Sequence, residues 1–189
     1  MRYQPSLQTE RLRLRPFVAD DADLLVQLAG TAAMAATAIA IPHPYTLTAA
    51  KSWIVGLSHR YRTGSAVHFA ISLLESKQLI GAIALNEINR DNANAELDVW
   101  IGQPWQRQGY ASEALQLVLD FAFKQMDLHR IYSYHFSEDL RSAKFLLKHG
   151  FAQEGVLRQA VKKMATYQDV SLSAILAESH RLNRNTDNN

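Results

Sequence analysis

Residues 11–17 alternate leucines with arginines, the two-residue period of a strand with one buried face. Three more β-like runs follow over residues 67–74, 78–88 and 95–101, separated by the turn-rich segments ESK and NRDNAN. Runs this close together, with short turns between them, predict an antiparallel meander in the middle of the chain. Further along, residues 129–136, 151–161 and 166–176 also have the composition of strands.

The apolar spacing changes to the period of a helix in four other stretches. Residues 22–28, 50–61, 111–122 and 140–147 each place apolar side chains on one face, which predicts amphipathic helices. The IPHPY segment between the first two is predicted to be a loop. Residues 1–178 therefore form one predicted domain. Residues 179–189, which are polar and lack periodicity, are predicted to be an irregular tail.

Composition narrows the classes of function. With 189 residues, of which 48% are hydrophobic, the chain can build one substantial core. It has no cysteine, which excludes disulfides, thiolate metal sites and a cysteine nucleophile. The formal charge of +2 is spread without a basic run, so no nucleic-acid or anionic-membrane partner is predicted.

Two further patterns are missing from the sequence. No apolar run reaches membrane-spanning length, and the first residues do not form a signal-peptide segment, so a cytoplasmic location is predicted. The seven histidines show no HExxH or closely paired ligand spacing, so no metal site is predicted. Charge and composition alone identify no partner.

The segment QPWQRQGYASEAL carries the first chemical signal. It places a glycine, Gly109, between a polar turn and a predicted helix. A strand, a turn and a helix start in this order direct several backbone N–H groups to one point, where an anion such as a phosphate can bind. Glycine serves either a close approach of the anion or a backbone conformation that other residues resist. The glycine spacing matches neither a Walker loop nor a Rossmann fingerprint.

The ordered set of motifs resembles the GNAT acetyltransferases, and in particular their RimJ/RimL-type branch. The GNAT signature is Gln or Arg, two residues, Gly, one residue, then Gly or Ala, and QRQGYA matches it with Gln106, Gly109 and Ala111. TERLRLRPF, the PYT segment, LIGAIAL, GYASEAL and RSAKFLLKHGF extend the resemblance in the expected order over about residues 7–177. Each motif is weak alone, whereas the ordered set is specific.

The resemblance implies an α+β fold of three layers. A mixed, mainly antiparallel sheet would carry helices on both faces, and its fourth and fifth strands would splay apart around acetyl-CoA, the co-substrate. The turn before the helix would then hold the pyrophosphate and the preceding strand would hold the pantetheine arm, although packing is a competing role for Trp100. The implied CoA-binding residues are Val99, Trp100, Ile101, Gln106, Arg107, Gln108, Gly109, Tyr110, Ala111, Ser112 and Asp139.

The implied chemistry is direct attack of a neutral amine on the acetyl thioester. Glu96 stands about where many GNAT enzymes keep a carboxylate base, and Asp98 on the same strand face competes for the role. Ser142 matches the serine of the branch's Asn-x-x-Ser helix start and would lie near the CoA sulfur; a first-turn hydroxyl is its alternative role. Asp139 replaces the usual Asn, and Leu146 replaces a tyrosine acid.

The amine acceptor is less constrained by the sequence. The resemblance places the IPHPY loop beside the acceptor, so His43 and Tyr45 are candidate substrate-binding residues together with Asp98. The RimJ/RimL branch points to protein or peptide N-terminal amines. A small amine such as a polyamine, an amino acid or an antibiotic is the alternative, as is a catalytically weak CoA-binding module. A homodimer is compatible with the resemblance, and the sequence leaves the oligomeric state open.

Overall fold

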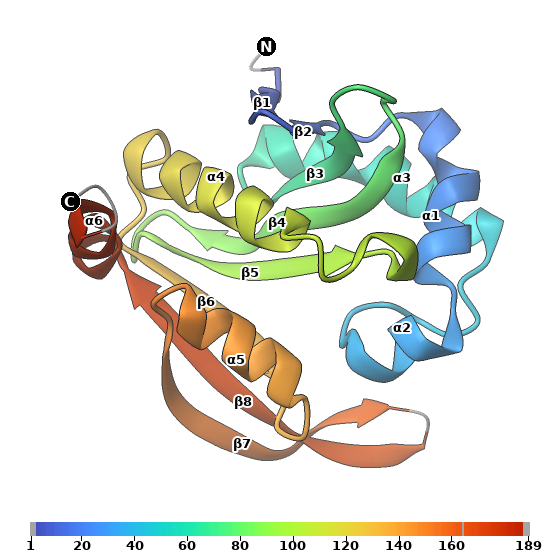
Figure 1. The fold of residues 1–189 in the computed structure, drawn as a ribbon. Helices are drawn as coiled ribbons and strands as arrows, with labels where there is room; N and C mark the ends of the chain where they lie inside the picture. The colour runs from blue at the N-terminus through green and yellow to red at the C-terminus, as the bar shows by residue number, and fades with distance from the viewer. Residues whose placement is uncertain (1–2, 164, 187–189) are drawn as a thin grey trace.

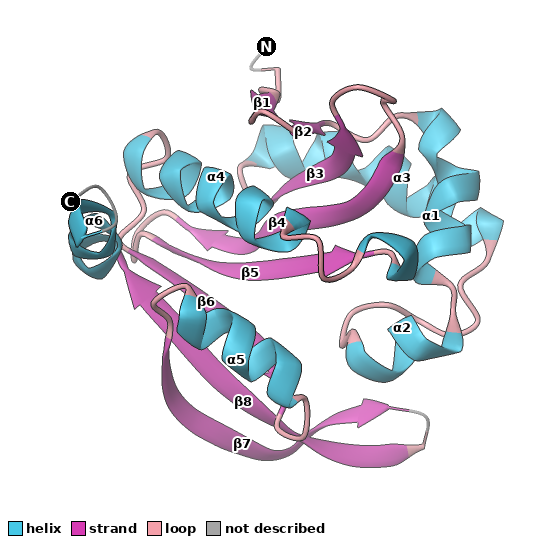
Figure 2. Ribbon diagram, in the orientation of Figure 1, coloured by secondary structure: helices cyan, strands magenta, loops and turns pink. Residues whose placement is uncertain are grey.

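The computed structural model describes residues 3–163 and 165–186 of the chain, arranged as one sheet with helices packed on it (Figures 1 and 2). The strands are β1 (Leu7–Gln8), β2 (Leu12–Arg15), β3 (Val67–Leu73), β4 (Leu79–Asn89), β5 (Asn94–Ile101), β6 (Arg130–Phe136), β7 (Ala152–Lys163) and β8 (Thr166–Leu176). The helices are α1 (Ala22–Ala29), α2 (Ala32–Thr37), α3 (Leu47–Thr63), α4 (Tyr110–Lys124), α5 (Leu140–Lys148) and α6 (Ala177–Thr186), with short 3-10 turns η1 (Ala19–Asp21) and η2 (Gln103–Trp105).

The strands form one sheet in the order β1-β2-β3-β4-β5-β6-β8-β7. All neighbours are antiparallel except β5 and β6, which run parallel. These two strands pair through residues 94–96 and 130–132 and then diverge (Figure 1). The predicted fold class, with its mixed sheet and splayed strands, is confirmed. The splayed strands are fifth and sixth in the structure because the sequence analysis missed β1.

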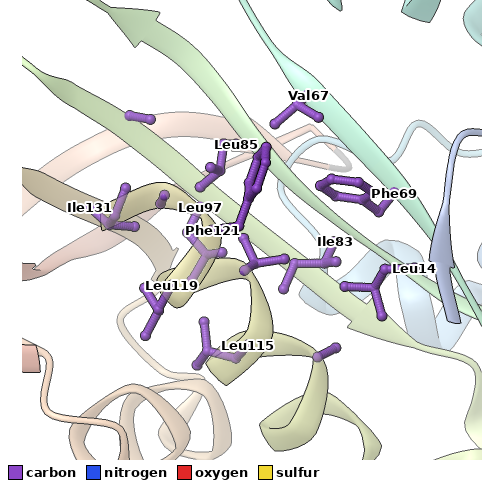
Figure 3. Packing of buried hydrophobic residues seen from close by; sticks show 14 of the residues in the cluster. Leu14, Val67, Phe69, Ile83, Leu85, Leu97, Leu115, Leu119, Phe121 and Ile131 are labelled. Atoms are coloured by element: carbon purple, nitrogen blue, oxygen red, sulfur yellow. The ribbon is translucent and has the colours of Figure 1, made fainter. Parts of the chain in front are cut away.

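The main core lies between the sheet and α4. The apolar stripe predicted on α4 is buried, because residues three and four apart share one face of a helix. The side chains that meet there include Phe69, Ile83, Leu85, Leu97, Leu115, Leu119 and Phe121 (Figure 3). A second cluster from α1, α2 and α3 covers the opposite face, where Trp100 of β5 packs against it. Helices therefore lie on both faces of the sheet.

Two short elements near the N-terminus were missed by the sequence analysis. β1 has two residues, too few to establish an alternating pattern. α2 has six residues, mostly alanine, and so has no polar face to contrast with an apolar one. Helix α3 begins at Leu47, three residues before the predicted stretch 50–61, because the Thr46 side chain caps it by accepting a hydrogen bond from Ala49 N–H at 3.2 Å.

The irregular structure predicted for residues 179–189 was wrong over residues 179–186, which belong to α6; residues 187–189 lie outside the described ranges. His180 anchors this helix. Its side chain is 3% exposed, its Nε2 lies 2.9 Å from Asp120 Oδ1 on α4, and its ring packs on Phe123. A tertiary contact thus supports a helix that local periodicity does not indicate. Within residues 3–163 and 165–186, no helix has both the length and the apolar character to cross a bilayer.

Candidate active site

A cavity of about 970 Å³ occupies the region where β5 and β6 separate. Its walls come from β4, β5, β6, the turn before α4, α5, the tip of the β7–β8 hairpin and residues 34–40. Most of the residues predicted for the site line this cavity: Glu96, Asp98, Val99, Trp100, Ile101, Gln106, Arg107, Gly109, Tyr110, Ala111, Ser112, Asp139 and Ser142. Segments far apart in the sequence therefore line the same cavity.

Three of the predicted residues do not line the cavity. Gln108 is exposed, and its side-chain amide donates to Pro104 O at 3.0 Å. His43 is exposed, while Tyr45 packs against the second hydrophobic cluster. The wall expected from the IPHPY loop is formed instead by residues 34–40. Alanine-rich stretches give no chemical signal, so the sequence analysis did not single out this segment.

The turn before α4 leaves backbone donors free. The first helical bond runs from Glu113 N–H to Gly109 O at 3.0 Å, so the N–H groups of residues 110–112 have no partner within the helix. Gly109 occupies the N-cap position, and no side chain caps the helix there. The positive end of the helix dipole adds to these donors. The turn is thus suited to bind an anion.

Gly109 is required for its backbone conformation. Its φ is 83°, in the left-handed region that glycine adopts without strain. A Cβ built at this position would meet Arg11 Nη2 at 3.4 Å, an ordinary contact distance. The positive φ thus supports the second explanation given by the sequence, a backbone conformation that other residues resist. Arg107, two residues earlier, also has a positive φ of 63°.

Arg11 holds this turn in place, and the sequence analysis missed that role. Its Nη1 donates to Gln108 O at 3.1 Å, its Nε donates to Glu113 Oε2 at 2.7 Å, and its guanidinium lies 4.8 Å from the centre of the Tyr110 ring. Glu113 also accepts a hydrogen bond from the Thr9 hydroxyl. Alternation predicted Arg11 as the exposed face of a strand. No pattern in the sequence links it to a turn almost a hundred residues away.

The first turn of α5 is closed by its own side chains. Asp139 Oδ1 accepts from the N–H groups of Arg141 and Ser142 at 3.1 and 3.2 Å, and the Ser142 hydroxyl donates to Asp139 Oδ2 at 2.7 Å. A carboxylate here satisfies the helix donors and opposes a second negative charge. Of the two helix N-termini at the cavity, the one at α4 is therefore the better anion site. Leu146, further along α5, is buried.

Glu96 and Asp98 share one face of β5, because alternate residues of a strand point the same way. Burial raises the pKa of Glu96, and the nearby carboxylates of Asp98 and Glu87 raise it further. Burial also raises the pKa of Asp98, against a smaller lowering by a hydrogen bond from the Val99 N–H. A carboxylate with a raised pKa is a stronger base than an exposed one. The pair can therefore accept a proton inside the cavity.

The part of the chain that the structure describes contains no cluster of side chains suited to bind a metal ion. There, no group of three or more His, Asp or Glu side chains could hold a metal ion.

The comparisons with known proteins agree with this geometry. Residues 11–152 match the Acetyltransferase (GNAT) domain family. The uncharacterized N-acetyltransferase p20 of Bacillus licheniformis is 31% identical over 176 residues, which are 93% of this chain and 98% of that protein. The ribosomal-protein-serine acetyltransferase of Escherichia coli is 32% identical over 119 residues, and the spermidine N(1)-acetyltransferase of Vibrio cholerae is 34% identical over 108 residues. Those two alignments cover 63% and 57% of this chain, and 65% and 62% of the respective relatives.

Solved structures show the same fold. RimL, a ribosomal L7/L12 alpha-N-protein acetyltransferase solved in complex with coenzyme A, superposes with a TM-score of 0.85 at 20% identity, covering 93% of this chain and 99% of that chain. This family uses acetyl-CoA, and its members with similar sequences or folds include ribosomal-protein acetyltransferases of the RimJ/RimL type. The chain belongs to the GNAT acetyltransferase family and is an N-acetyltransferase.

Proposed function

We propose that this protein transfers the acetyl group of acetyl-CoA to the α-amine of a protein or peptide N-terminus. The observation that carries the proposal is that one cavity joins an uncapped helix N-terminus to two carboxylates of raised pKa. Its volume of about 970 Å³ lies at the upper end of the range for small-molecule sites, which is ample for the thioester end of one substrate and the amine of another.

Acetyl-CoA fits this cavity through its phosphates and its amide arm. We assign the pyrophosphate to the backbone N–H groups of residues 107–112, the uncapped end of α4. We assign the pantetheine arm to the edge of β5 over residues 99–101, where β5 has no pairing partner on the β6 side. An extended amide chain can use such an edge as a strand would. Trp100 packs against the second cluster, which supports packing, the competing role given for this residue.

Glu96 is our candidate for the general base. It pairs with Tyr132 at the last paired position before β5 and β6 diverge, and it lines the cavity there. As the amine nitrogen bonds to the carbonyl carbon, a proton passes from nitrogen to the carboxylate, and the carbon–sulfur bond then breaks with its electron pair leaving on sulfur. Asp98 is the competing acceptor of that proton, directly or through water.

The leaving thiolate needs little assistance. A thiol with an ordinary pKa of about 8.5 is a fair leaving group without an acid. Ser142 is the candidate donor on this wall, but its hydroxyl hydrogen points to Asp139, so it must turn away to reach the sulfur. Leu146 has no proton to give. We therefore assign the final protonation to Ser142 or to water.

The acceptor assignment rests on amine chemistry and on the relatives. A peptide α-amine has an ordinary pKa of about 7.7–8.0 and a lysine side chain one of about 10.4, so at neutral pH far more of the α-amine is a neutral nucleophile. The ribosomal-protein-serine acetyltransferase among the relatives supports a protein acceptor. The spermidine acetyltransferase and the paired carboxylates support a small polycation as the second candidate.

The proposal predicts the outcome of an acceptor panel assayed by CoA release. A peptide with a free, small N-terminal residue should give the highest kcat/KM, above its N-acetylated lysine-containing counterpart, spermidine and a free amino acid. Fastest transfer to spermidine would favour the small-amine alternative instead. Tight acetyl-CoA binding without CoA release to any amine would indicate a binding module and contradict the proposal.

A further inference from the structure

The tip of the β7–β8 hairpin is bent by an irregularity in β7. The pairing register changes between Leu157 and Val161, and Gln159 in that interval has a positive φ of 49°. The Gln159 N–H donates to Asp169 Oδ1 at 2.7 Å, which fixes the bulge through the facing strand. Bulges bend a strand and increase its twist. Beyond the bulge, the hairpin tip turns toward α2 (Figure 1).

Lys163 at this tip bonds to a distant loop. Its Nζ donates to the carbonyl oxygens of Ala38 at 2.8 Å, Ile39 at 3.4 Å and Ile41 at 2.6 Å. An ammonium group has three donors and no acceptor, so these three carbonyls account for its whole hydrogen-bonding capacity. The lysine is thus bound to one loop, with no donor left over for a substrate.

The loop that Lys163 holds is a wall of the cavity. Residues 38–40 line it, as Lys163 itself does, and the loop belongs to neither a helix nor a strand. In the described part of the chain, Lys163 makes the only side-chain hydrogen bonds to residues 38–41. Without it, backbone carbonyls in this loop would lose their charged donor. Lys163, more than a hundred residues later in the sequence, therefore helps to hold this wall, together with the packing of Ala38 and Ile41 in the second cluster.

We propose that Lys163 is a positioning residue that sets acceptor specificity by holding residues 38–41 against the cavity. This inference rests on the proposed function, because it takes the wall formed by residues 34–40 as the acceptor side. The hydrogen-bond partners of Lys163 include neither the turn before α4 nor the carboxylates of β5. Its action is therefore on the amine acceptor and not on acetyl-CoA.

Lys163→Met keeps an unbranched side chain one heavy atom shorter and removes the ammonium. We expect the KM for a peptide acceptor to rise about tenfold, while the KM for acetyl-CoA stays within about twofold. Relative kcat/KM should also shift toward acceptors with a bulky first residue, because the wall can then yield. Lys163→Arg, which keeps a charged donor, should recover part of the loss. Lys162→Met is the matched control, since Lys162 is exposed on the same hairpin and lies 5.6 Å from the Tyr167 ring.

Amide hydrogen exchange gives a readout that needs no acceptor. In Lys163→Met, exchange should accelerate in residues 36–41 and remain native elsewhere, whereas Lys162→Met should match the native protein throughout. Unchanged exchange in this loop, or an equal rise in both KM values with faster exchange everywhere, would overturn the inference. If the native enzyme acetylates no peptide, the proposed acceptor is wrong. The role of Lys163 is then decided by the exchange result and by the KM values measured with the amine that reacts fastest in the panel.

Discussion

Replacing Glu96 by glutamine is expected to lower kcat by about a hundredfold while leaving the Kd for acetyl-CoA within about twofold of native. Glutamine has nearly the same shape but cannot take up the amine proton. The residue lies where β5 and β6 part, away from the backbone donors at α4, so binding of acetyl-CoA should not depend on it. Steady-state CoA release and calorimetric binding measure the two quantities.

The pH profile separates the base from other roles. Burial and the neighbouring carboxylates raise the pKa of Glu96, so native kcat/KM should climb as the pH rises through that value. This limb should vanish in Glu96→Gln, and a limb from the acceptor's own pKa of about 8 should remain. Glu87→Gln is the control. It should keep native kcat on the plateau and move the limb slightly to lower pH, because Glu87 helps to raise the pKa of Glu96.

The thermal stability of Glu96→Gln gives an independent check that the pKa of Glu96 is raised in the folded protein. Because the folded-state pKa of Glu96 is raised, ionisation of Glu96 opposes folding as the pH rises above its ordinary value of about 4.3. Glu96→Gln should therefore have a higher Tm than native at pH 7, and this advantage should disappear below about pH 4. Native rates in the variant between pH 6 and 8 would remove Glu96 as base, and Asp98→Asn would then test the neighbouring carboxylate.

Substituting valine for Gly109 should weaken acetyl-CoA binding by about a hundredfold, the loss of about two charge-assisted hydrogen bonds at the lower end of their usual strength. A β-branched residue strongly resists a φ of 83°, so the turn must rearrange. The N–H groups of residues 107–112 would then no longer converge. Calorimetric titration with CoA and acetyl-CoA measures the change.

Gly64→Val controls for strain alone. Gly64 ends α3 with a φ of 74°, and a Cβ there meets nothing within 4 Å, so valine carries a similar backbone penalty away from the cavity. Both variants should unfold at a lower denaturant concentration than native, and Gly64→Val should bind acetyl-CoA normally. Equal affinity of the folded Gly109→Val and native proteins would contradict the assignment of the pyrophosphate.

The long elements, and the residues that line the cavity along β5 and the turn before α4, could be predicted because their signals are local. The stripe on α4 and the alternation of β5 each follow from neighbouring residues, and the turn with Gly109 lies between them. α6 could not be predicted, since its anchor is a contact between His180 and Asp120 on another helix. β1 and α2 are too short for periodicity to appear.

The wall that we assign to the acceptor was harder to predict, because its residues give no local signal. It uses small side chains, such as Ala36 and Ala38, which carry no chemistry. Its support comes from Lys163, bonded to residues more than a hundred positions earlier, and the turn before α4 is similarly held by Arg11. Such pairings depend on the register of the sheet and on a bulge near Gln159. A single sequence shows neither of these features.

The most direct test of the proposed acceptor is a peptide that carries both a free N-terminal alanine and one internal lysine. After partial turnover with acetyl-CoA near pH 7, tandem mass spectrometry of the product locates the acetyl group. The account predicts that it lies on the α-amine in the large majority of molecules, because the two amines differ by about 2.4–2.7 units in ordinary pKa. Preferential acetylation of the lysine would contradict the account.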